Sequence, residues 1–457
     1  MASLNARRGF PGDPAPVSVA GPPVVSGALP VVGHGPTFLR DPVGLLERGH
    51  AEHGRVFALR MGRRPVVVVL GAEHNRRVLK GTGRSLSIRS AYPFFVRMFD
   101  EGFYFFAGEE EYRRQRDLVL PRFQSRQLDA YVTVMEDHTR RLMDRMGERG
   151  ELDLVDELGV LVMRIAADAF LGADASEHVR GFFPLFRAFS GGMDPVLPGW
   201  LPVPRLVRSR RAREVLRRDL LGLLDHRRRH PVDPPDFLQM LAESRYADGG
   251  EVSDLVLANL VLMLIWAGHE TTTGHLAWAF ADLLSHPGEL ERVRVEAREA
   301  GAWGGGLSVG AVHRLAYLER ALRETERLHP VAFMLAREAV EAMSFGGYRV
   351  EAGTMVFLSP AISHRLAQEY PDPGVFRPDR FLDAPQGVAD LIGFGGGLHR
   401  CLGVRFAYLE MKVVMTLLLQ RYDFTLVDEV VPVRGARTRW PTRPCRVRYR
   451  LRAPGGG

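Results

Sequence analysis

Helical patterning dominates the middle of this 457-residue chain. From residue 109 to residue 285 apolar side chains recur at helical spacing, with breaks near residues 191–204 and 230–236. Strand signals are few. The β-branched segments 56–61 and 66–70 flank a Gly- and Pro-containing turn and predict a hairpin, and residues 343–358 predict a second small strand region. The sequence therefore predicts a mainly α fold with small β-sheets.

Length and composition set the domain organisation. Apolar residues make up 46% and charged residues 25% of the chain, which excludes a disordered or membrane-embedded protein. A chain of this length suits either two domains or one large domain built around a cofactor. Because there is no internal repeat and no low-complexity linker, we expect a Pro-rich extended arm over residues 1–35 and a single domain over residues 36–457.

The charge and the cysteine content limit the cellular compartments in which the protein is expected. The formal net charge is +7, and Lys80 and Lys412 are the only lysines, a bias typical of a GC-rich bacterial genome rather than of nucleic-acid binding. The two cysteines, Cys401 and Cys445, exclude a disulfide framework. No signal peptide is visible, and the apolar run 255–267 is shorter than the ~20 residues that span a bilayer. We expect a cytoplasmic protein without a membrane anchor.

One cysteine lies in an unusual local context. Three glycines at positions 395–397 precede Cys401, and Gly403 leads into a predicted helix over residues 404–419. A cysteine at a helix N-terminus is stabilised as the thiolate by the helix dipole and free amides. Cys401 is therefore either a metal ligand or a small buried apolar residue, whereas Cys445 is predicted to be structural.

The second candidate site interrupts a strongly apolar helix. Ala267, Gly268, His269, Glu270 and Thr271 are followed by two more threonines and a glycine, which are poor helix formers. The Thr271 hydroxyl can bond a carbonyl one turn back, and Glu270 supplies a titratable group in an apolar setting. This combination suits water-assisted proton delivery. The alternative is a helix–helix contact made by small residues.

The third candidate is a pair of opposite charges. Glu324 and Arg327 stand at i and i+3, a spacing that usually marks a weak surface pair. Arg380, within the segment 376–381, offers a second cation. A buried Glu–Arg–Arg network would satisfy charges that are costly to bury singly.

Taken in order, these segments resemble the cytochrome P450 family of haem-thiolate monooxygenases from residue 22 onward. Phe394, Gly397, Cys401 and Gly403 match the cysteine loop of the family; Ala267, Gly268, Glu270 and Thr271 match its oxygen-activation motif; and Glu324, Arg327 and Arg380 match its charge network. The resemblance implies a cytochrome P450 fold with heme b (iron protoporphyrin IX) between the long central helix and the cysteine-loop helix. Cys401 would ligate the iron, and Glu270 and Thr271 would deliver protons as catalytic residues.

The resemblance also implies contacts to the haem. Tyr112 and Arg116 stand where the family usually has a Trp–Arg motif, with Tyr112 in place of the tryptophan. Arg337, His399 and Tyr92 stand at further propionate positions. The cofactor-binding residues so implied are Tyr92, Tyr112, Arg116, Ala267, Gly268, Arg337, Phe394, Gly397, His399 and Gly403.

Within the family, the aromatic loop that begins at Tyr92 is similar to the substrate loop of bacterial sterol 14α-demethylases, but Glu270 stands where those enzymes typically carry histidine. We therefore expect hydroxylation of a bulky lipophilic substrate (a terpenoid, polyketide or sterol-like molecule) in secondary metabolism, with sterol 14α-demethylation as the alternative. The predicted substrate pocket consists of Phe95, Phe99, Leu264, Phe333 and Leu335.

The reaction implied by the resemblance uses O2 as cosubstrate and electrons from NAD(P)H. No dinucleotide fingerprint and no flavin domain are present, so electrons should come through an external ferredoxin and ferredoxin reductase, with Arg113, Arg114 and Arg405 steering the docking of an acidic ferredoxin. We expect a monomer that binds no nucleic acid. Rival interpretations are a peroxygenase, a haem isomerase or a non-catalytic haem-binding sensor; the Glu270–Thr271 pair argues against all three.

Overall fold

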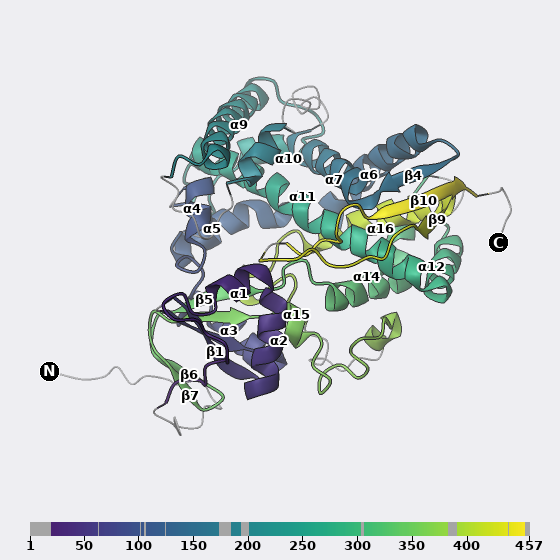
Figure 1. Ribbon diagram of the computed structural model, residues 1–457. Coiled ribbons are helices and arrows are strands. Elements are labelled where there is room, and N and C mark those ends of the chain that lie inside the picture. Colours follow the sequence, from purple (N-terminus) through teal and green to yellow (C-terminus); the bar gives the residue numbers. More distant parts are fainter. Residues whose placement is uncertain are drawn as a thin grey trace.

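The computed structural model describes residues 20–452, except 63, 101, 105, 106, 124, 173–183, 193–200, 303–305, 383–390 and 437 (Figure 1). Most of the predicted arm, residues 1–19, therefore lies outside the described residues. Helices make up the larger part of what is described, and the strands form small sheets, so the predicted fold class is confirmed.

The helical part of the molecule follows from the apolar periodicity of the middle and end of the chain. Its principal helices are α5 (Glu109–Val119), α6 (Ser125–Met146), α7 (Leu154–Leu171), α9 (Pro204–Arg229), α10 (Phe237–Ala242), α11 (Asp254–Ser285), α12 (Pro287–Glu299), α13 (Val309–Arg314), α14 (Ala316–Leu328) and α16 (Val404–Arg421). The remaining helices are α1 (Gly35–Arg40), α2 (Pro42–His53), α3 (Ala72–Gly81), α4 (Pro93–Phe99) and α15 (Pro360–Ser363).

Helix α11 is the centre of the fold. Its 32 residues pack against α7, α9, α14 and α16. It is longer than the apolar run 255–267 suggests, because apolar residues resume after Glu270 and continue the helix to Ser285. By length and composition α11 could cross a membrane, but more than half of its most apolar window is buried inside the protein. Its hydrophobicity is thus accounted for by its central position.

The largest sheet has five strands in the order β1-β2-β8-β5-β3. The predicted hairpin is β1 (Val56–Met61) and β2 (Arg64–Val69), paired in antiparallel register from Val56–Val69 to Met61–Arg64. Strand β8 (Met355–Leu358) runs parallel to β2 and antiparallel to β5 (Leu335–Ala339), which pairs with β3 (Leu86–Ser87). The short hairpin of β6 (Met343–Phe345) and β7 (Tyr348–Val350) lies in the second predicted strand region.

A three-stranded sheet near the C-terminus was not predicted. Strand β10 (Arg446–Leu451) lies between β4 (Arg149–Asp153) and β9 (Tyr422–Leu426). Strand β4 lies within the region that was expected to be helical. Its sequence Arg-Gly-Glu-Leu-Asp has no strong preference for helix or strand, so its extended form depends on its pairing with β10.

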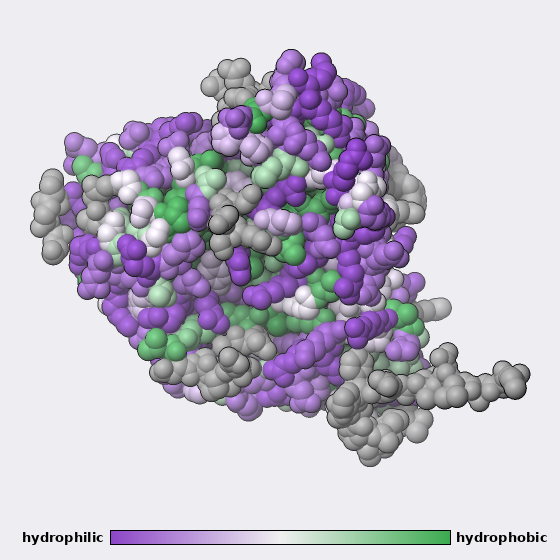
Figure 2. Space-filling model, turned by 180° about the vertical axis from the view of Figure 1, so that it is seen from behind, coloured by the Kyte–Doolittle hydropathy of each residue, from purple (hydrophilic) through white to green (hydrophobic). Residues whose placement is uncertain are grey.

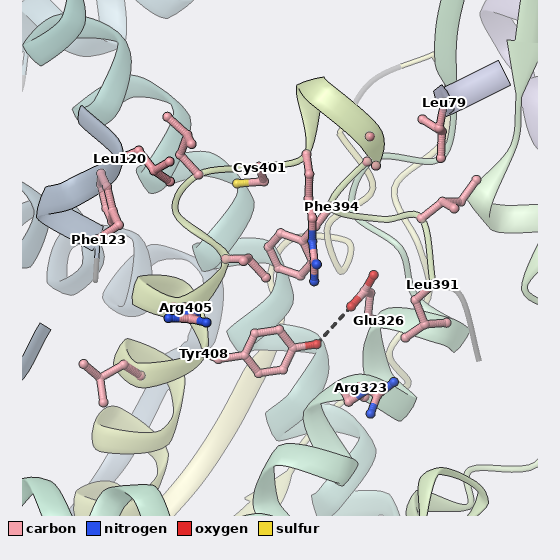
Figure 3. Close-up of a pocket in the computed structure, with 18 of the residues that line it drawn as sticks. Leu79, Leu120, Phe123, Arg323, Glu326, Leu391, Phe394, Cys401, Arg405 and Tyr408 are labelled. Atoms are coloured by element: carbon pink, nitrogen blue, oxygen red, sulfur yellow. Dashed lines mark hydrogen bonds between the residues drawn. The ribbon is translucent and has the colours of Figure 1, made fainter. Parts of the chain in front are cut away.

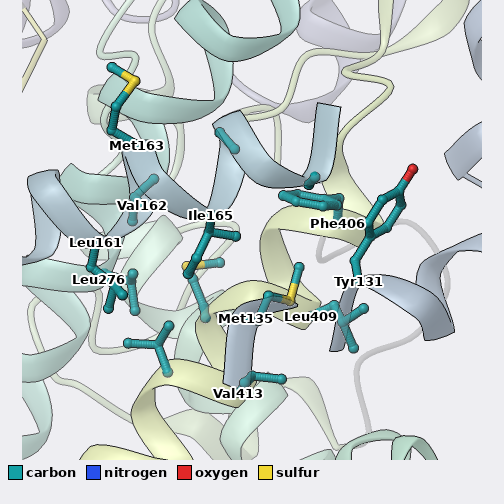
Figure 4. Packing of buried hydrophobic residues seen from close by; sticks show 14 of the residues in the cluster. Tyr131, Met135, Leu161, Val162, Met163, Ile165, Leu276, Phe406, Leu409 and Val413 are labelled. Carbon is teal, nitrogen blue, oxygen red and sulfur yellow. The ribbon is translucent and has the colours of Figure 1, made fainter. Parts of the chain in front are cut away.

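The main apolar core lies where α6, α7, α11 and α16 meet (Figure 4). Tyr131 and Met135 of α6, Ile165 of α7 and Phe406 and Leu409 of α16 are all buried there. This core holds α16, and with it the preceding cysteine loop, against the central helix. On the face seen in Figure 2, hydrophobic patches lie between hydrophilic ones near the middle of the molecule.

Candidate active site

The cysteine loop has one backbone shape that its glycines permit. Gly395 and Gly397 adopt positive φ angles of 69° and 61°, and a Cβ atom at Gly397 would collide with the carbonyl of Leu79 on α3. The loop closes on itself through a hydrogen bond of 2.9 Å from the Cys401 amide to the Phe394 carbonyl. Gly403 then caps α16 at its N-terminus. Cys401 is therefore held at a fixed place just before a helix.

Cys401 lines a cavity of about 1450 Å³ together with residues of α3, α14 and α16 (Figure 3). Its side chain is exposed and lines this cavity. Burial raises the pKa of the Cys401 thiol, while the Gly403 amide and the Arg400 charge act in the opposite direction. Cys445 differs, since it is buried in the core and burial together with nearby Asp153 raises its pKa to about 12.

The central helix has an open face in its middle. Ala267 and Thr271 are exposed although the stretches 257–265 and 272–283 of the same helix are buried, and nothing lies within 4 Å of a Cβ atom at Gly268. The Thr271 hydroxyl donates to the Ala267 carbonyl at 2.7 Å. Burial raises the pKa of the neighbouring Glu270 carboxyl, and the positive charge of Arg443 lowers it in part. Ala267 and Thr271 are thus accessible and are not packed against a neighbouring helix.

The Glu–Arg–Arg network is buried and closely bonded. Glu324 and Arg327 have exposed side-chain fractions of 0%, and both Nε and Nη2 of Arg327 donate to the Glu324 carboxylate at 2.8 Å. Arg380 Nε donates to Glu324 at 2.9 and 3.1 Å, and the Arg377 amide adds a bond of 2.9 Å. The remaining donors of Arg327 reach backbone carbonyls of residues 364, 373 and 375. The network ties α14 to the segment that leads to the cysteine loop.

A second group of cations has no carboxylate partner among the residues that the structure describes. Arg337 on β5 is 2% exposed, and its guanidinium donates to the Thr82 hydroxyl and to the Ala336 carbonyl. Burial lowers the pKa of this guanidinium. Arg116 on α5 has a buried Nε without a hydrogen-bond partner. Within the described part of the chain, no carboxylate pairs with Arg116 or Arg337, so an anion would relieve both.

Tyrosine and histidine side chains surround these cations. The Tyr112 ring lies 4.1 Å from the His399 ring, and its hydroxyl donates to the Leu398 carbonyl at 3.2 Å. Burial, with the charges of Arg337 and Arg116, lowers the pKa of His399 to about 3, so that its imidazole is neutral. The Tyr92 hydroxyl accepts a bond of 2.8 Å from the Ala336 amide. The structure thus brings the five predicted propionate contacts into one region around the cysteine loop, α5 and β5.

The predicted substrate wall is only partly assembled as expected. Phe95 and Phe99 of α4 contact Trp266, with ring centroids 5.4 and 6.1 Å apart. Phe95 and Leu335 are half-buried, whereas Phe99, Leu264 and Phe333 are buried, and Phe333 packs in a separate core with residues of β1 and β2. Their lining of a substrate pocket stays a prediction. Trp266 was missed by sequence reasoning, although its position before Ala267 places it on the same helix.

Comparison with known proteins decides the family. The profile of the family described as Cytochrome P450 matches residues 22–438. The chain belongs to the cytochrome P450 family. A sterol 14alpha-demethylase from Mycolicibacterium vanbaalenii is 30% identical over 450 residues, which cover 94% of this chain and 98% of that protein. A lanosterol 14-alpha demethylase from Bos taurus is 27% identical over 451 residues, covering 96% of this chain and 90% of its own.

A solved structure agrees with the family in three dimensions. Retinoic acid bound cyanobacterial CYP120A1 superposes with a TM-score of 0.84 at 27% sequence identity, covering 95% of this chain and 100% of its own. The cytochrome P450 fold predicted from the sequence is therefore confirmed. Membership of this family implies haem as cofactor, O2 as cosubstrate and monooxygenase activity.

The residues present in this P450 fit a haem. Cys401 offers a sulfur ligand with an amide of Gly403 directed at it, and Gly268 leaves the central helix open. Arg116 and Arg337 supply the positive charge that two carboxylates of an iron porphyrin require, with hydroxyl and imidazole groups beside them. The assignment of individual contacts remains a proposal.

Two further residues of this P450 were not found from the sequence. Glu326 of α14 lies in the cavity beneath the cysteine loop, where it accepts a bond of 2.9 Å from the Tyr408 hydroxyl (Figure 3). Burial raises the pKa of Glu326 to about 7, and the Tyr408 bond acts against this rise. Glu326 lies inside the Glu324–Arg327 motif, where the sequence gives it no signal of its own. Tyr408 lies one turn of α16 beyond Val404, so its helical spacing is the signal that marks it.

Proposed function

We propose that this P450 hydroxylates a bulky, mostly apolar molecule of terpenoid, polyketide or sterol-like type in a biosynthetic pathway. The observation that carries the proposal is the open face of α11, where the exposed Ala267 and Thr271 follow Trp266 and its aromatic contact with Phe95. Proton-delivering groups and an apolar wall thus lie next to each other on one helix, as oxidation of an unreactive C–H bond requires.

Each group of residues has a proposed task. The haem, when bound, supplies the chemistry of placing one atom of O2 into a C–H bond while the other leaves as water. Cys401 holds the iron, and Arg116, Arg337, Tyr92, Tyr112 and His399 hold the propionates. Glu270 takes protons from solvent and passes them toward the Thr271 hydroxyl. The aromatic side chains of α4 and Trp266 orient the substrate and exclude water.

The proposed substrate class is supported by the aromatic side chains near α11 and by the proteins to which this chain is similar. Phenylalanine and tryptophan rings present large rigid surfaces suited to a polycyclic or polyene substrate. One related structure holds retinoic acid, which is a terpenoid. Sterol 14α-demethylation is the second candidate, because sterol demethylases match nearly the whole chain. Glu270 in place of their usual histidine favours the single hydroxylation.

We propose that electrons come from NAD(P)H through an external ferredoxin and its reductase. We also propose that the protein is a monomer in the cytoplasm. Arg405 lines the cavity beneath the cysteine loop with Arg76, Lys80, Arg323 and Arg400, which makes this face cationic. Arg113 and Arg114 contribute less than expected from the sequence, because Arg113 pairs with Glu109 at 2.6 Å and Arg114 with Glu111 and Asp248 at 3.1 and 2.9 Å. Arg405 is thus the better candidate for steering.

The test is turnover with a surrogate ferredoxin system, comparing polycyclic terpenoids with lanosterol-type sterols. We expect one oxygen atom to be added to a terpenoid, with uncoupled peroxide release rising in Thr271→Ala but not in Thr271→Ser. Release of formic acid from a sterol 14α-methyl group would establish demethylation instead. Binding of ligands with no product from any of them would favour a haem-binding sensor and overturn the proposal.

A further inference from the structure

The C-terminal chain between β9 and β10 lies against the central helix at Glu270 (Figure 1). Trp440 Nε1 on this chain donates to the Glu270 carbonyl at 3.0 Å. A Cβ atom at Gly274 would come within 2.5 Å of the Trp440 ring, so the indole can lie this close only because Gly274 has no side chain. The Trp440 indole thus occupies a place on α11 that a glycine leaves open.

The carbonyl that Trp440 binds belongs to the peptide unit between the proposed acid and the proposed alcohol. The oxygen of this planar unit comes from Glu270, and its N–H comes from Thr271. In an α-helix the same oxygen accepts the amide of the residue four positions further on, which here is Gly274. Trp440 therefore adds a donor from outside the helix to the peptide that orients the Glu270 and Thr271 side chains relative to each other.

The helix is weak by itself at this point. The hydroxyls of Thr271 and Thr273 donate to the carbonyls of Ala267 and His269, both at 2.7 Å. Such side-chain bonds compete with the amides of the helix and slightly destabilise or bend it. Threonine and glycine are also poor helix formers. The bond from Trp440, by contrast, comes from another segment of the chain and can hold this turn in place.

Trp440 is itself held from several sides. Its carbonyl accepts the Val433 amide at 2.9 Å, and the amide of the preceding Arg439 donates to the Val331 carbonyl at 3.0 Å. The Arg443 guanidinium lies 5.3 Å from the centre of the Trp440 ring. These contacts do not involve α11, so the indole is a fixed support for the helix.

Resting on the proposed function, we propose that Trp440 is a positioning residue. Its indole N–H holds the peptide between Glu270 and Thr271 and so keeps the acid and the alcohol in one relative orientation. Trp440 does not carry the proton, because an indole N–H only donates a hydrogen bond. The proton passes from the Glu270 carboxyl toward the Thr271 hydroxyl, and this transfer depends on the distance and angle between the two groups. A looser peptide would deliver protons out of step with electrons.

The experiment is hydrogen–deuterium exchange of the haem-loaded ferric protein, followed in the segment 267–274. Trp440→Phe keeps an aromatic ring and removes the donor. Exchange in this segment should become about five-fold faster, the factor that corresponds to the loss of one hydrogen bond worth ~1 kcal/mol. Trp278→Phe is the matched control, because Trp278 Nε1 donates to the Arg439 carbonyl at 2.9 Å and ties the same chain to the same helix away from the motif. This control should leave exchange in the segment unchanged.

Gly274→Ala is the second test of the proposal. Alanine is the better helix former, so helix propensity alone predicts slower exchange in this variant. The added Cβ atom would displace the Trp440 indole, and we therefore expect faster exchange in the segment 267–274. Slower exchange in Gly274→Ala, equal effects of Trp440→Phe and Trp278→Phe, or no effect of Trp440→Phe would each overturn the proposal.

Turnover distinguishes this proposal from the proposed function. The exchange measurement needs no substrate, so failure to find a substrate would refute the proposed function and leave the exchange result standing. With a substrate in hand, Trp440→Phe should raise the share of electrons lost to hydrogen peroxide at an unchanged KM, and Trp278→Phe should not. Unchanged coupling of electrons to product in Trp440→Phe would contradict the positioning role.

Discussion

Removing the anion of the buried charge network should destabilise the protein by several kcal/mol. In Glu324→Gln the side chain keeps its size, but Arg327 and Arg380, whose side chains are 0% and 6% exposed, lose their counter-charge. Leaving a buried cation unpaired costs about 3–5 kcal/mol. With about 2.1 cal/mol/K of unfolding entropy per residue, a chain of 457 residues loses about 1 °C of Tm per kcal/mol. We expect Tm to fall by about 3–5 °C.

The assay is thermal unfolding followed by circular dichroism at a fixed scan rate, with haem retention measured in parallel. Glu109→Gln is the control, because Glu109 forms a pair with Arg113 of the same charge type on the surface, worth about 0.2–1 kcal/mol. Arg380→Gln keeps the Arg327–Glu324 pair and should give a smaller loss than Glu324→Gln. A shift in Glu324→Gln no larger than that of the control would refute the claim that this network is a buried, mutually dependent set of charges.

Three further results are expected. Cys401→Ser should abolish the red-shifted Soret band of the reduced, CO-bound protein and Cys445→Ser should not; retention of the band in Cys401→Ser would place the iron ligand elsewhere. Glu410 is 1% exposed, and burial raises the pKa of its carboxyl well above normal, so the folded state holds a proton that the unfolded state releases. The free energy of unfolding should therefore fall by about 1.4 kcal/mol per pH unit as the pH rises above the pKa of the unfolded state. In denaturant titrations at mildly acidic and mildly alkaline pH, Glu410→Gln should flatten this slope, and an unchanged slope would show that Glu410 is not its source. Reduction by an acidic ferredoxin should slow as ionic strength rises, and less steeply in Arg405→Gln; salt-independent rates would exclude electrostatic steering at this face.

The local sequence predicts those elements whose stabilising contacts lie between residues close together in the chain. The hairpin of β1 and β2 follows from two β-branched runs around a turn, and α16 from apolar spacing after Gly403. The same holds for the cysteine loop, since Gly397 and Cys401 are close enough in the chain for their spacing to describe one rigid loop. Such features were predictable because their determining contacts lie within a few residues of each other.

Contacts between distant segments could not be read in this way. Strand β4 has little strand preference and exists because β10, about 300 residues later, pairs with it. The Glu324–Arg327 spacing also occurs on the surface, and its burial depends on Arg380 and on the carbonyls of residues 364, 373 and 375.

The environment of Glu270 shows most clearly what depends on local sequence and what depends on contacts between distant segments. The sequence by itself determined that an acid and an alcohol stand side by side in an apolar helix. Only the tertiary structure brought Trp440, about 170 residues further along, onto that helix, with Arg443 beside the Trp440 ring and paired with Asp156 of α7. Because a carboxyl's pKa depends on burial and on charges within a few ångströms, whichever segments supply them, residue type alone did not decide how this acid ionises.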